Sequence, residues 1–521
     1  MAFIKSFKHQ TYLLPLNICD MIPEDHICFL VEEIVEKIDF SEFEQHYSGA
    51  GHPAYHPRIM CKILIQSTLD RVRSSRAIAR NVRENLVYMY LAEKVEPDFR
   101  TISDFRKNNL NLLEDIFKIT ICSAKDLGAV GLEKLSVDGT VIKASASHHS
   151  AVTEKELEVI EEYVQNELKK GIEIDRVEDE LFKNSRGYDQ LDNSGKNRVK
   201  SVVARYIKQV NKSKKDRISE IKENIKETKI EFQTDKANKI SLTDKDSRYM
   251  VNKKGKAEFS YNAQITVDHN TGIIVANDVC QDRNDIQQLI PQIEITEKNC
   301  GNLEEGTKIC ADNGYYSVKN IKFSAMKKLD IYIPNVEQAS RKNDICTGTK
   351  KEKDRFHISN FKYDPEKDEY ICPEQNRMVY STLNYNKHKK QYVKRYRGRG
   401  CRNCAYLTLC TKSKENVRKL NILVKSKEVL ELNEKMNTKE AKNIFGERKQ
   451  TVEPVIGNYK ENLGFRNCLT RGIKAVRAEF NLICAAVNIR KIAIFKQKKL
   501  ETDNSQNLDK RSIRGQLTVV S

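Results

Sequence analysis

The sequence predicts an α/β protein in which helices cover a mixed β-sheet, with a helical N-terminal domain and two insertions. Three observations predict this fold class. Residues 1–125 carry apolar side chains at helical spacing, and short apolar runs typical of strands recur from residue 133 to residue 333. Two highly charged stretches interrupt these runs. The resulting order of strand, insertion, hairpin, helix, strand, turn, helix and strand is the pattern of a mixed sheet with helices on its faces.

Length and charge narrow the class of protein. The chain has 521 residues, with 91 Lys and Arg against 73 Asp and Glu, so its formal charge is +18. No run approaches the roughly 20 apolar residues that a membrane span needs. The first residues lack the apolar core of a secretory signal, so we expect a cytoplasmic protein with reduced cysteines. The positive charge favours a polyanionic partner, and nucleic acid is the leading one.

The helices of the N-terminal domain, residues 1–128, begin at recognisable residues. Pro57 suits a first helical position, Ser74 would cap a second helix, and Thr101 would cap a third after a Pro-Asp break. The second helix carries three arginines on one face: Arg76, Arg80 and Arg83. Short helices with a basic face are typical of DNA docking, although a solvated helical face explains them equally well. We predict a DNA-binding domain.

The next segment, residues 129–336, holds the first strands. Leu135, Val137 and Val141 indicate a buried strand, and two apolar runs around Gly272 indicate a hairpin. We expect a helix that opens at Asp285, and strands at 307–311 and 329–333. Residues of about 150–240 combine 20 basic with 19 acidic side chains and show no sustained heptad repeat. We predict a helical insertion there, with a solvated hairpin as the ordinary form.

Three segments complete the chain. Residues 337–440 form a basic insertion with cysteines, residues 441–496 return to helix, and residues 497–521 are a polar tail that we expect to be disordered. Without its insertions, the strand order is in the style of ribonuclease H. We therefore predict an RNase H-like catalytic domain that extends from residue 129 to residue 496.

Two aspartates lie where strands of such a sheet would bring carboxylates together. Asp138 lies within one apolar strand and Asp312 directly follows another. Mg²⁺ prefers oxygen ligands, and two ions ~3.5–4 Å apart can clamp the oxygens of a phosphoryl displacement. By themselves the two aspartates are better explained as turn residues, because glycine follows each closely. Three other acids compete on composition alone: Asp268, Asp278 and Asp282.

A third element supplies a glutamate at residues 445–460, which read F-G-E-R-K-Q-T-V-E-P-V-I-G-N-Y-K. Glu453 and Lys460 are seven residues apart, so on a helix they share one face two turns apart. One group would suit a metal ion and the other a DNA phosphate. Because a residue before proline avoids the helical conformation, we place Glu453 at the first turn of its helix, just before Pro454.

With this element the chain resembles bacterial insertion-sequence transposases of the DDE class, in the group with a Tyr-Arg-Glu-Lys signature. The resemblance covers nearly the whole chain and follows six motifs in order. They are G-H-P-A-Y-H-P at 51–57 with S-S-R at 74–76, P-D-F-R-T-I-S-D-F-R at 97–106, V-D-G-T at 137–140, Y-N-A-Q at 261–264, A-D-N-G-Y at 311–315 and V-E-P-V-I-G at 452–457.

The resemblance implies a catalytic triad of Asp138, Asp312 and Glu453 that binds two Mg²⁺ or Mn²⁺ ions. Its accessory lysine matches Lys460, and its arginine matches Arg448 or the neighbouring Lys449. The tyrosine position holds Phe445, which lacks the hydroxyl. Metal-activated water would cut the phosphodiester at each transposon end, and the freed 3′-hydroxyl would attack target DNA.

The partners implied are double-stranded DNA, as terminal inverted repeats and target, and a second copy in a homodimer. A bacterial, nucleoid-associated location follows. Two alternatives stay open. One is a catalytically inactive, domesticated DNA-binding protein of the same fold, and the other is an RNase H-like nuclease that cuts without strand transfer.

Basic residues and cysteines gather late in the chain. Residues 381–420 hold twelve Lys and Arg against one acid. Among them Lys394, Arg395 and Arg397 interleave with Tyr392 and Tyr396, which suits phosphate neutralisation and base stacking, with a solvated basic hairpin as the alternative. Four cysteines suit a structural Zn²⁺, with reduced surface thiols as the alternative. They are Cys372, Cys401, Cys404 and Cys410.

Overall fold

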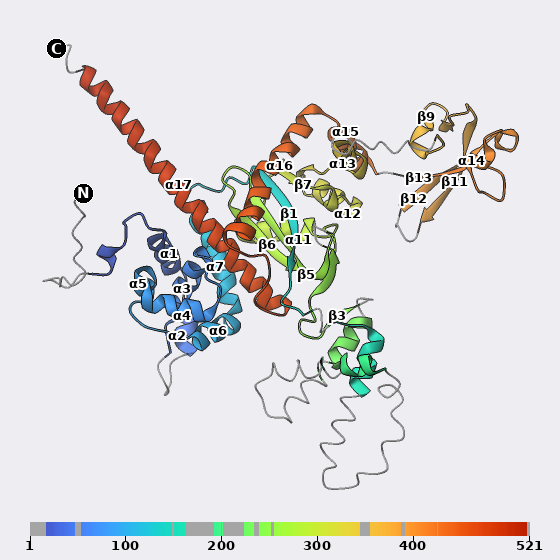
Figure 1. Cartoon of the computed structure of the whole chain (residues 1–521). Helices are drawn as coiled ribbons and strands as arrows, with labels where there is room; N and C mark the ends of the chain where they lie inside the picture. Colours follow the sequence, from blue (N-terminus) through green and yellow to red (C-terminus); the bar gives the residue numbers. More distant parts are fainter. Residues whose placement is uncertain are drawn as a thin grey trace, which may run out of the picture. The chain divides into compact units, whose positions relative to one another are not determined.

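A computed structural model of the chain forms two compact units (Figure 1). Unit one comprises residues 1–315, 328–330 and 445–521, and unit two comprises residues 316–327 and 331–444. The structure describes residues 17–46, 54–147, 151–162, 192–198, 201, 223, 225–233, 239–251, 255–343, 355–386, 391–424 and 426–517. Within these ranges, no helix is long and apolar enough to cross a membrane.

The N-terminal part of unit one is helical, as predicted. Its elements are η1 (Cys19–Met21), α1 (Ile27–Glu36), α2 (Ser41–His46), α3 (Pro57–Leu69), α4 (Ser75–Glu84), α5 (Leu86–Leu91), α6 (Phe99–Asn108) and α7 (Leu110–Asp126). The predicted starts at Pro57 and after Ser74 are confirmed. Thr101 does not cap α6. The carboxylate of Asp98 does, because it accepts the backbone N–H of Thr101 at 2.7 Å.

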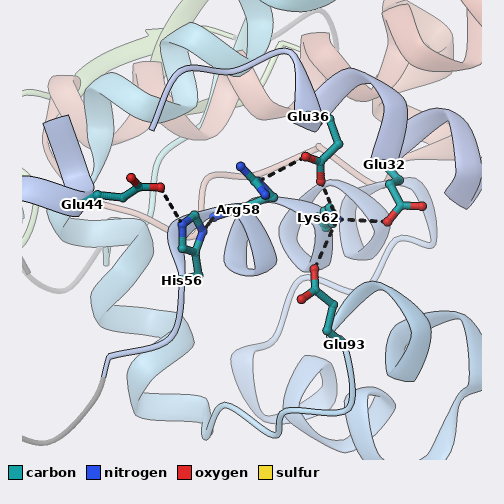
Figure 2. A network of polar contacts seen from close by, with 7 residues as sticks. All are labelled: Glu32, Glu36, Glu44, His56, Arg58, Lys62 and Glu93. Carbon is teal, nitrogen blue, oxygen red and sulfur yellow. Dashed lines mark hydrogen bonds and ion pairs between the residues drawn. The ribbon is translucent and has the colours of Figure 1, made fainter. Parts of the chain in front are cut away.

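A buried lysine joins several of these helices (Figure 2). The ammonium of Lys62 on α3 lies 3.1 Å from Glu32 and 2.9 Å from Glu36, both on α1, and 3.5 Å from Glu93 after α5. Its side chain is only 2% exposed. Burial lowers the pKa of Lys62, but hydrogen bonds to Glu36 and Glu32 outweigh burial and raise this pKa above its usual value. Lys62 therefore stays charged and holds the helices together.

The sheet of unit one is mixed, as predicted. Its strands are β1 (Lys134–Lys143), β4 (Arg248–Val251), β5 (Ala257–Asp268), β6 (Ile274–Cys280), β7 (Lys308–Ala311) and β8 (Asp330–Tyr332), of which only Asp330 belongs to unit one. The order is β4-β5-β1-β7-β8, and β6 pairs with the other edge of β5. β1 is antiparallel to β5 and parallel to β7. The predicted hairpin is confirmed as β5 and β6, with Gly272 in the left-handed region at φ 75°.

The charged insertion leaves the sheet and returns to it at one place. Its ends form β2 (Ala151–Val152) and β3 (Ile240–Ser241), which pair antiparallel. Residues 154–162 and 225–233, which lie between these two strands in the sequence, are helical. Most of the predicted helical insertion lies outside the described residues.

Helices of the second half of the chain complete unit one. They are α11 (Leu289–Cys300), η4 (Asn313–Tyr315), α16 (Lys439–Gly457), which belongs to unit one from Phe445 onward, the π-helical turn η7 (Asn458–Asn462) and α17 (Ile473–Leu517). α17, drawn in red in Figure 1, packs against α7, α3 and β6. We predicted a disordered tail from residue 497, but α17 continues to Leu517. The segment has no proline and many helix-favouring residues, which explains the difference.

Unit two is built around an antiparallel sheet. Its elements are α12 (Val318–Met326), α13 (Val336–Asn343), η5 (Ile358–Asn360), β9 (Lys362–Asp364), β10 (Glu369–Ile371), β11 (Arg377–Asn386), β12 (Gln391–Gly398), η6 (Cys401–Asn403), α14 (Leu407–Cys410), β13 (Lys419–Leu423) and α15 (Lys427–Lys435). The strand order is β13-β12-β11-β10-β9. Phe361, Met378, Tyr396 and Leu420 form a small core in this sheet.

Candidate active site

Strand register brings the two predicted catalytic aspartates together. Val137 on β1 pairs in parallel with Ala311 on β7, so the following residues, Asp138 and Asp312, lie at the same level of neighbouring strands. Each carboxylate also accepts a nearby backbone N–H. Asp138 accepts that of Gly139 at 2.9 Å, and Asp312 accepts that of Gly314 at 2.8 Å. Each aspartate can therefore stabilise a turn, as the sequence suggested, and also belong to a catalytic site.

A buried tyrosine lies close enough to these two carboxylates for their charges to affect its pKa. Tyr315 ends η4 and is fully buried. Burial raises its pKa well above the usual value, and the negative charges of Asp285, Asp138 and Asp312 raise this pKa further. Three aspartates from three parts of the chain thus act on one phenol. Only two of them belong to the predicted triad.

The third predicted acid lies inside a helix rather than at its start. Glu453 and Pro454 belong to the last third of α16, so the placement of Glu453 in a first helical turn is wrong. Packing overrides the local effect of proline, because Val452 and Val455 on either side are 0% and 1% exposed. The side chain of Glu453 is 51% exposed.

An arginine links two of the predicted catalytic acids. Arg448 on α16 lies 3.2 Å from Oδ2 of Asp138 and 3.9 Å from Oε1 of Glu453. Its side chain is 9% exposed. Within the described part of the chain, its buried Nε and Nη1 atoms make no hydrogen bond. Its guanidinium also lies 5.7 Å from the ring centroid of Phe445. The ring keeps a contact with the arginine without the hydroxyl of a tyrosine.

Lys460 does not continue the helical face of Glu453. α16 ends at Gly457, and Lys460 lies in η7, whose wider turn changes the direction of the side chains. The prediction of a shared helical face is therefore wrong. The ammonium of Lys460 donates to the hydroxyl of Thr140 and lies 3.4 Å from the carbonyl oxygen of Val141. Lys460 thus fastens η7 to β1 just beyond Asp138.

Residues that we did not predict fix α16 along β1. Glu447, next to Arg448, pairs with Lys134 at the start of β1 and lies 3.3 Å from Nε2 of His269. Nδ1 of the same histidine lies 2.7 Å from the hydroxyl of Thr451. Burial and the charge of Lys134 lower the pKa of His269. These contacts set the position of α16, and hence of Arg448, relative to the strand.

The aspartates that competed with the triad have structural partners. Asp268 is 1% exposed and accepts the backbone N–H groups of Gly131 and Leu132 at 3.1 and 3.0 Å. Asp278 pairs with Arg477 at 2.7 Å. Asp282 accepts the side-chain amide of Gln288. These contacts give each competitor a role in holding loops and strands.

Asp285 was missed as a site residue. We expected it to open a helix, but α11 begins at Leu289. Its Oδ1 instead accepts the side-chain amides of Asn262 at 2.7 Å and Gln264 at 2.6 Å. Both amides lie on β5, where Gln264 is opposite Gly139. The Y-N-A-Q motif contains both amides, but in the sequence it served only as part of the family resemblance.

The donor set has the right chemistry for a hard divalent cation. Asp138, Asp312 and Glu453 offer oxygen ligands, which Mg²⁺ and Mn²⁺ prefer. In the described residues, however, no group of three or more His, Cys, Asp or Glu side chains is close enough to hold a metal ion. Arg448 supplies the positive charge between Asp138 and Glu453 in this arrangement.

The predicted basic residues of unit two lie on β12, the second strand from one edge of the sheet. Lys394 pairs with Asp368 at 3.0 Å, Arg397 pairs with Glu415 at 3.2 Å, and Arg395 donates to the side-chain oxygen of Asn421 at 3.1 Å. Lys394 and Arg397 are 39% and 47% exposed. The cations are therefore accessible and have weak surface partners.

The two tyrosines of this strand differ. Tyr392 is 55% exposed and meets the edge of Tyr385 across the hairpin. Tyr396 is 2% exposed, and its hydroxyl donates to Asp368 at 2.6 Å. Its ring lies in the small core with Met378, so the prediction that Tyr396 offers a stacking face is wrong. Tyr392 keeps that possibility.

The four predicted zinc ligands are near one another in unit two. Burial raises the pKa of the Cys410 thiol, and the neighbouring Cys401, Cys372 and Cys404 raise it further. All described cysteines are free of disulfides. Across the same residues, no set of these thiols has the geometry of a metal site.

The predicted arginines of α4 are exposed but not equivalent. Arg76 lies over the ring of Phe99 at 4.9 Å, and Arg83 pairs with Glu96 at 3.1 Å. Arg80 is exposed one turn after Arg76 on the same helix. Arg76 and Arg80 thus remain available on one face of the helix.

Comparison with known protein families gives two matches. Residues 371–493 match a family described as Transposase DDE domain, and residues 16–108 match one described as Transposase domain (DUF772). No curated protein matches the chain. The first match contains Arg448, Glu453 and Lys460. Together the two matches show a transposase of the DDE type. Such a transposase is a metal-dependent enzyme that cuts DNA, so DNA is its partner.

Proposed function

We propose that the chain cuts transposon-end DNA and joins the freed 3′ ends to target DNA. The sheet and helices of unit one would form an RNase H-like catalytic domain. Asp138, Asp312 and Glu453 would be its catalytic acids. The observation that carries this proposal is the parallel pairing of Val137 with Ala311, because it brings two acids from distant parts of the chain to one level of the sheet.

These three acids would hold two Mg²⁺ or Mn²⁺ ions, which supply an activated water and stabilise charge on the phosphate. The protein's own task is to hold groups in place. Arg448, whose guanidinium is ion-paired with Asp138, would place positive charge where a negatively charged oxygen of DNA approaches the acids. Lys460 holds η7 against β1, so the helix that carries Glu453 keeps its position relative to Asp138.

DNA binding would involve residues of both units. The exposed cations of β12 suit phosphates, and so do the arginines of α4 within residues 1–128. The proposed contacts are Lys394, Arg395, Arg397, Arg76 and Arg80. Because two transposon ends must be held together, we propose that the chain acts as a homodimer. The +18 charge of the chain supports a polyanionic partner.

Replacing Asp138 by Ala tests the catalytic assignment. Metal ligands supply several kcal/mol of transition-state stabilisation, so nicking of a labelled transposon-end duplex should fall by about 10³-fold or more. DNA affinity should stay within about threefold. Asp282→Asn, an exposed acid outside the triad, is the control and should nick at the wild-type rate. Full nicking activity in Asp138→Ala would overturn the assignment.

A strand-transfer assay with a pre-nicked end separates the transposase from the nuclease alternative. The wild-type protein should give joined product with Mg²⁺ or Mn²⁺. Cut DNA without joined product would favour a nuclease. DNA binding with neither cut nor joined product would favour the inactive, domesticated protein.

We also propose that Cys372, Cys401, Cys404 and Cys410 bind structural zinc. Their thiols lie near one another, and soft sulfur ligands favour this metal. Elemental analysis of protein purified without chelator should find about one zinc per chain. Cys484→Ser, which changes a buried cysteine of unit one, should keep that content. A content well below one zinc in the wild type would favour reduced thiols.

A further inference from the structure

A fourth carboxylate lies beside the proposed catalytic aspartates and belongs to no predicted triad. Asp285 lies in the loop between β6 and α11. Its Oδ1 atom accepts two hydrogen bonds, from the side-chain amides of Asn262 and Gln264. These two residues alternate along β5 and thus face the same side of the sheet. The two hydrogen bonds therefore fix the position of the Asp285 carboxylate relative to this side of β5.

Two glycines show how closely Asp285 approaches the backbone of the site. A Cβ at Gly139 would lie 2.7 Å from Oδ1 of Asp285, and a Cβ at Gly314 would lie 3.5 Å from its Oδ2. Gly139 directly follows Asp138, and Gly314 donates its N–H to Asp312. Asp285 thus packs against both turns that orient the proposed catalytic aspartates. A side chain at Gly139 would also collide with Gln264, at 2.2 Å.

A hydrogen-bond chain connects Asp285 with the turn after Asp312. The amide of Gln264 donates to Asp285, while its carbonyl oxygen accepts the hydroxyl of Tyr315. Tyr315 and Gln264 are both fully buried, so this connection excludes water. One side-chain amide therefore joins the loop of Asp285 to η4, which begins one residue after Asp312.

We propose that Asp285 is a positioning residue for the metal centre. Its carboxylate, held by Asn262 and Gln264, fixes the separation of Asp138 and Asp312 and adds a third negative charge beside them. Both effects increase the affinity for a divalent cation, as second-layer groups do at other metal sites. This inference rests on the proposed function, because it requires that Asp138 and Asp312 bind metal.

Titration of the full chain with Mn²⁺, followed by the electron paramagnetic resonance of the free ion, tests the proposal. Asp285→Asn keeps an oxygen for the two amides and removes the charge. Its Kd for Mn²⁺ should rise about 10-fold or more. Asp282→Asn, three residues earlier in the same loop and exposed, should bind Mn²⁺ as the wild type does. A wild-type Kd in Asp285→Asn overturns the proposal.

Nicking measured against Mn²⁺ concentration distinguishes positioning from a general role in folding. In Asp285→Asn, the Mn²⁺ concentration for half-maximal rate should rise about 10-fold, while the rate at saturating Mn²⁺ stays within about twofold. A purely structural role would lower the saturated rate or the thermal midpoint without moving the Mn²⁺ dependence. That result would overturn the proposal.

Two further variants complete the test. Asn262→Ala removes one of the two amides and leaves the charge, so it is measured if Asp285→Asn fails to fold. Its Kd for Mn²⁺ should rise about threefold, and an unchanged Kd overturns the proposal. Asp138→Ala should lose Mn²⁺ binding. If Asp138→Ala binds Mn²⁺ as tightly as the wild type, the proposed function fails, whereas an unchanged Asp285→Asn alone contradicts only the role of Asp285.

Discussion

The two compact units hold the side chains that we propose for function in opposite ways. In unit one, Arg448 and Asp138 are only 9% and 10% exposed, and strand register and helix packing fix their distance. In unit two, Lys394 and Arg397 are 39% and 47% exposed and pair with carboxylates at the surface. Exposed ion pairs contribute about 0–1 kcal/mol, so phosphates can replace the carboxylates at little cost.

The side chains of unit one thus have a fixed geometry, whereas the cations of unit two can exchange one anionic partner for another. Phosphoryl transfer needs reacting groups held in one arrangement, which buried residues on strands provide. Binding of a long polyanion needs cations that can follow it, which exposed side chains on a small sheet provide. The contrast predicts that changes at the buried acids of unit one affect the reaction, while changes on β12 of unit two affect binding and its dependence on salt.

Neutralising the cations of β12 gives the largest expected effect on binding. The triple variant Lys394→Gln, Arg395→Gln and Arg397→Gln should weaken DNA binding at least about 10-fold at low salt. Because each phosphate contact contributes about 0.9 to the salt slope, the slope of log K against log salt should fall by about 2 to 3. Fluorescence anisotropy at several salt concentrations measures both quantities.

A matched triple variant tests whether position or charge matters. Lys319, Lys322 and Lys327 lie exposed on or next to α12 in the same unit. Changing these three to Gln removes the same charge away from β12 and should leave most of the salt slope. Equal loss in both triple variants would contradict a specific DNA contact by β12.

Removing the buried lysine should affect neither binding nor chemistry, only stability. Lys62→Met leaves Glu32, Glu36 and Glu93 without their common partner (Figure 2). Breaking a fully buried pair costs about 3–5 kcal/mol and an exposed pair about 0–1. The glutamates are partly exposed, so we expect a loss of about 2 kcal/mol, measured by urea unfolding at pH 7.

The pH dependence of this loss has a defined sign. The folded state raises the pKa of Lys62, so its contribution is complete below the unfolded pKa of about 10.4. The contribution disappears as pH rises through the folded pKa. The difference between wild type and Lys62→Met should therefore be constant near neutrality and shrink above about pH 10.4. A difference that grows with alkaline pH would contradict this explanation.

The smallest expected effect separates the two tyrosines of β12. Tyr392→Ala removes an exposed ring and should weaken binding of single-stranded DNA by about 1 kcal/mol. Tyr396→Phe removes only the hydroxyl that donates to Asp368, so it should leave DNA affinity unchanged and cost about 1 kcal/mol of stability. A loss of affinity in Tyr396→Phe alone would reverse the assignment.

Local patterns predicted the elements that depend on near neighbours. The strand around Asp138, the hairpin at Gly272 and the helix start at Pro57 follow from alternation, turn residues and capping, and the structure contains all three. The convergence of Asp138 and Asp312 was predicted because strand ends in a mixed sheet are natural neighbours.

Long-range packing decided the rest. A local rule put Glu453 at a helix start, whereas buried contacts of Val452 and Val455 keep the helix intact across Pro454. The burial of Tyr396 could not be predicted for the same reason. Which face of β12 packs into the core depends on how β12 pairs with β11 and β13. Asp285 was missed because its partners lie more than twenty residues away on β5.

The pairing of β2 with β3 has a consequence for engineering the protein. Residues 151 and 241 are paired, so the 89 residues between them begin and end at the same place in the fold. The free energy of closing a loop at such a point depends only weakly on loop length, because each doubling of the length costs about 0.6 kcal/mol. The insertion between β2 and β3 can therefore be replaced by a short linker or a foreign domain while the sheet of unit one keeps its register.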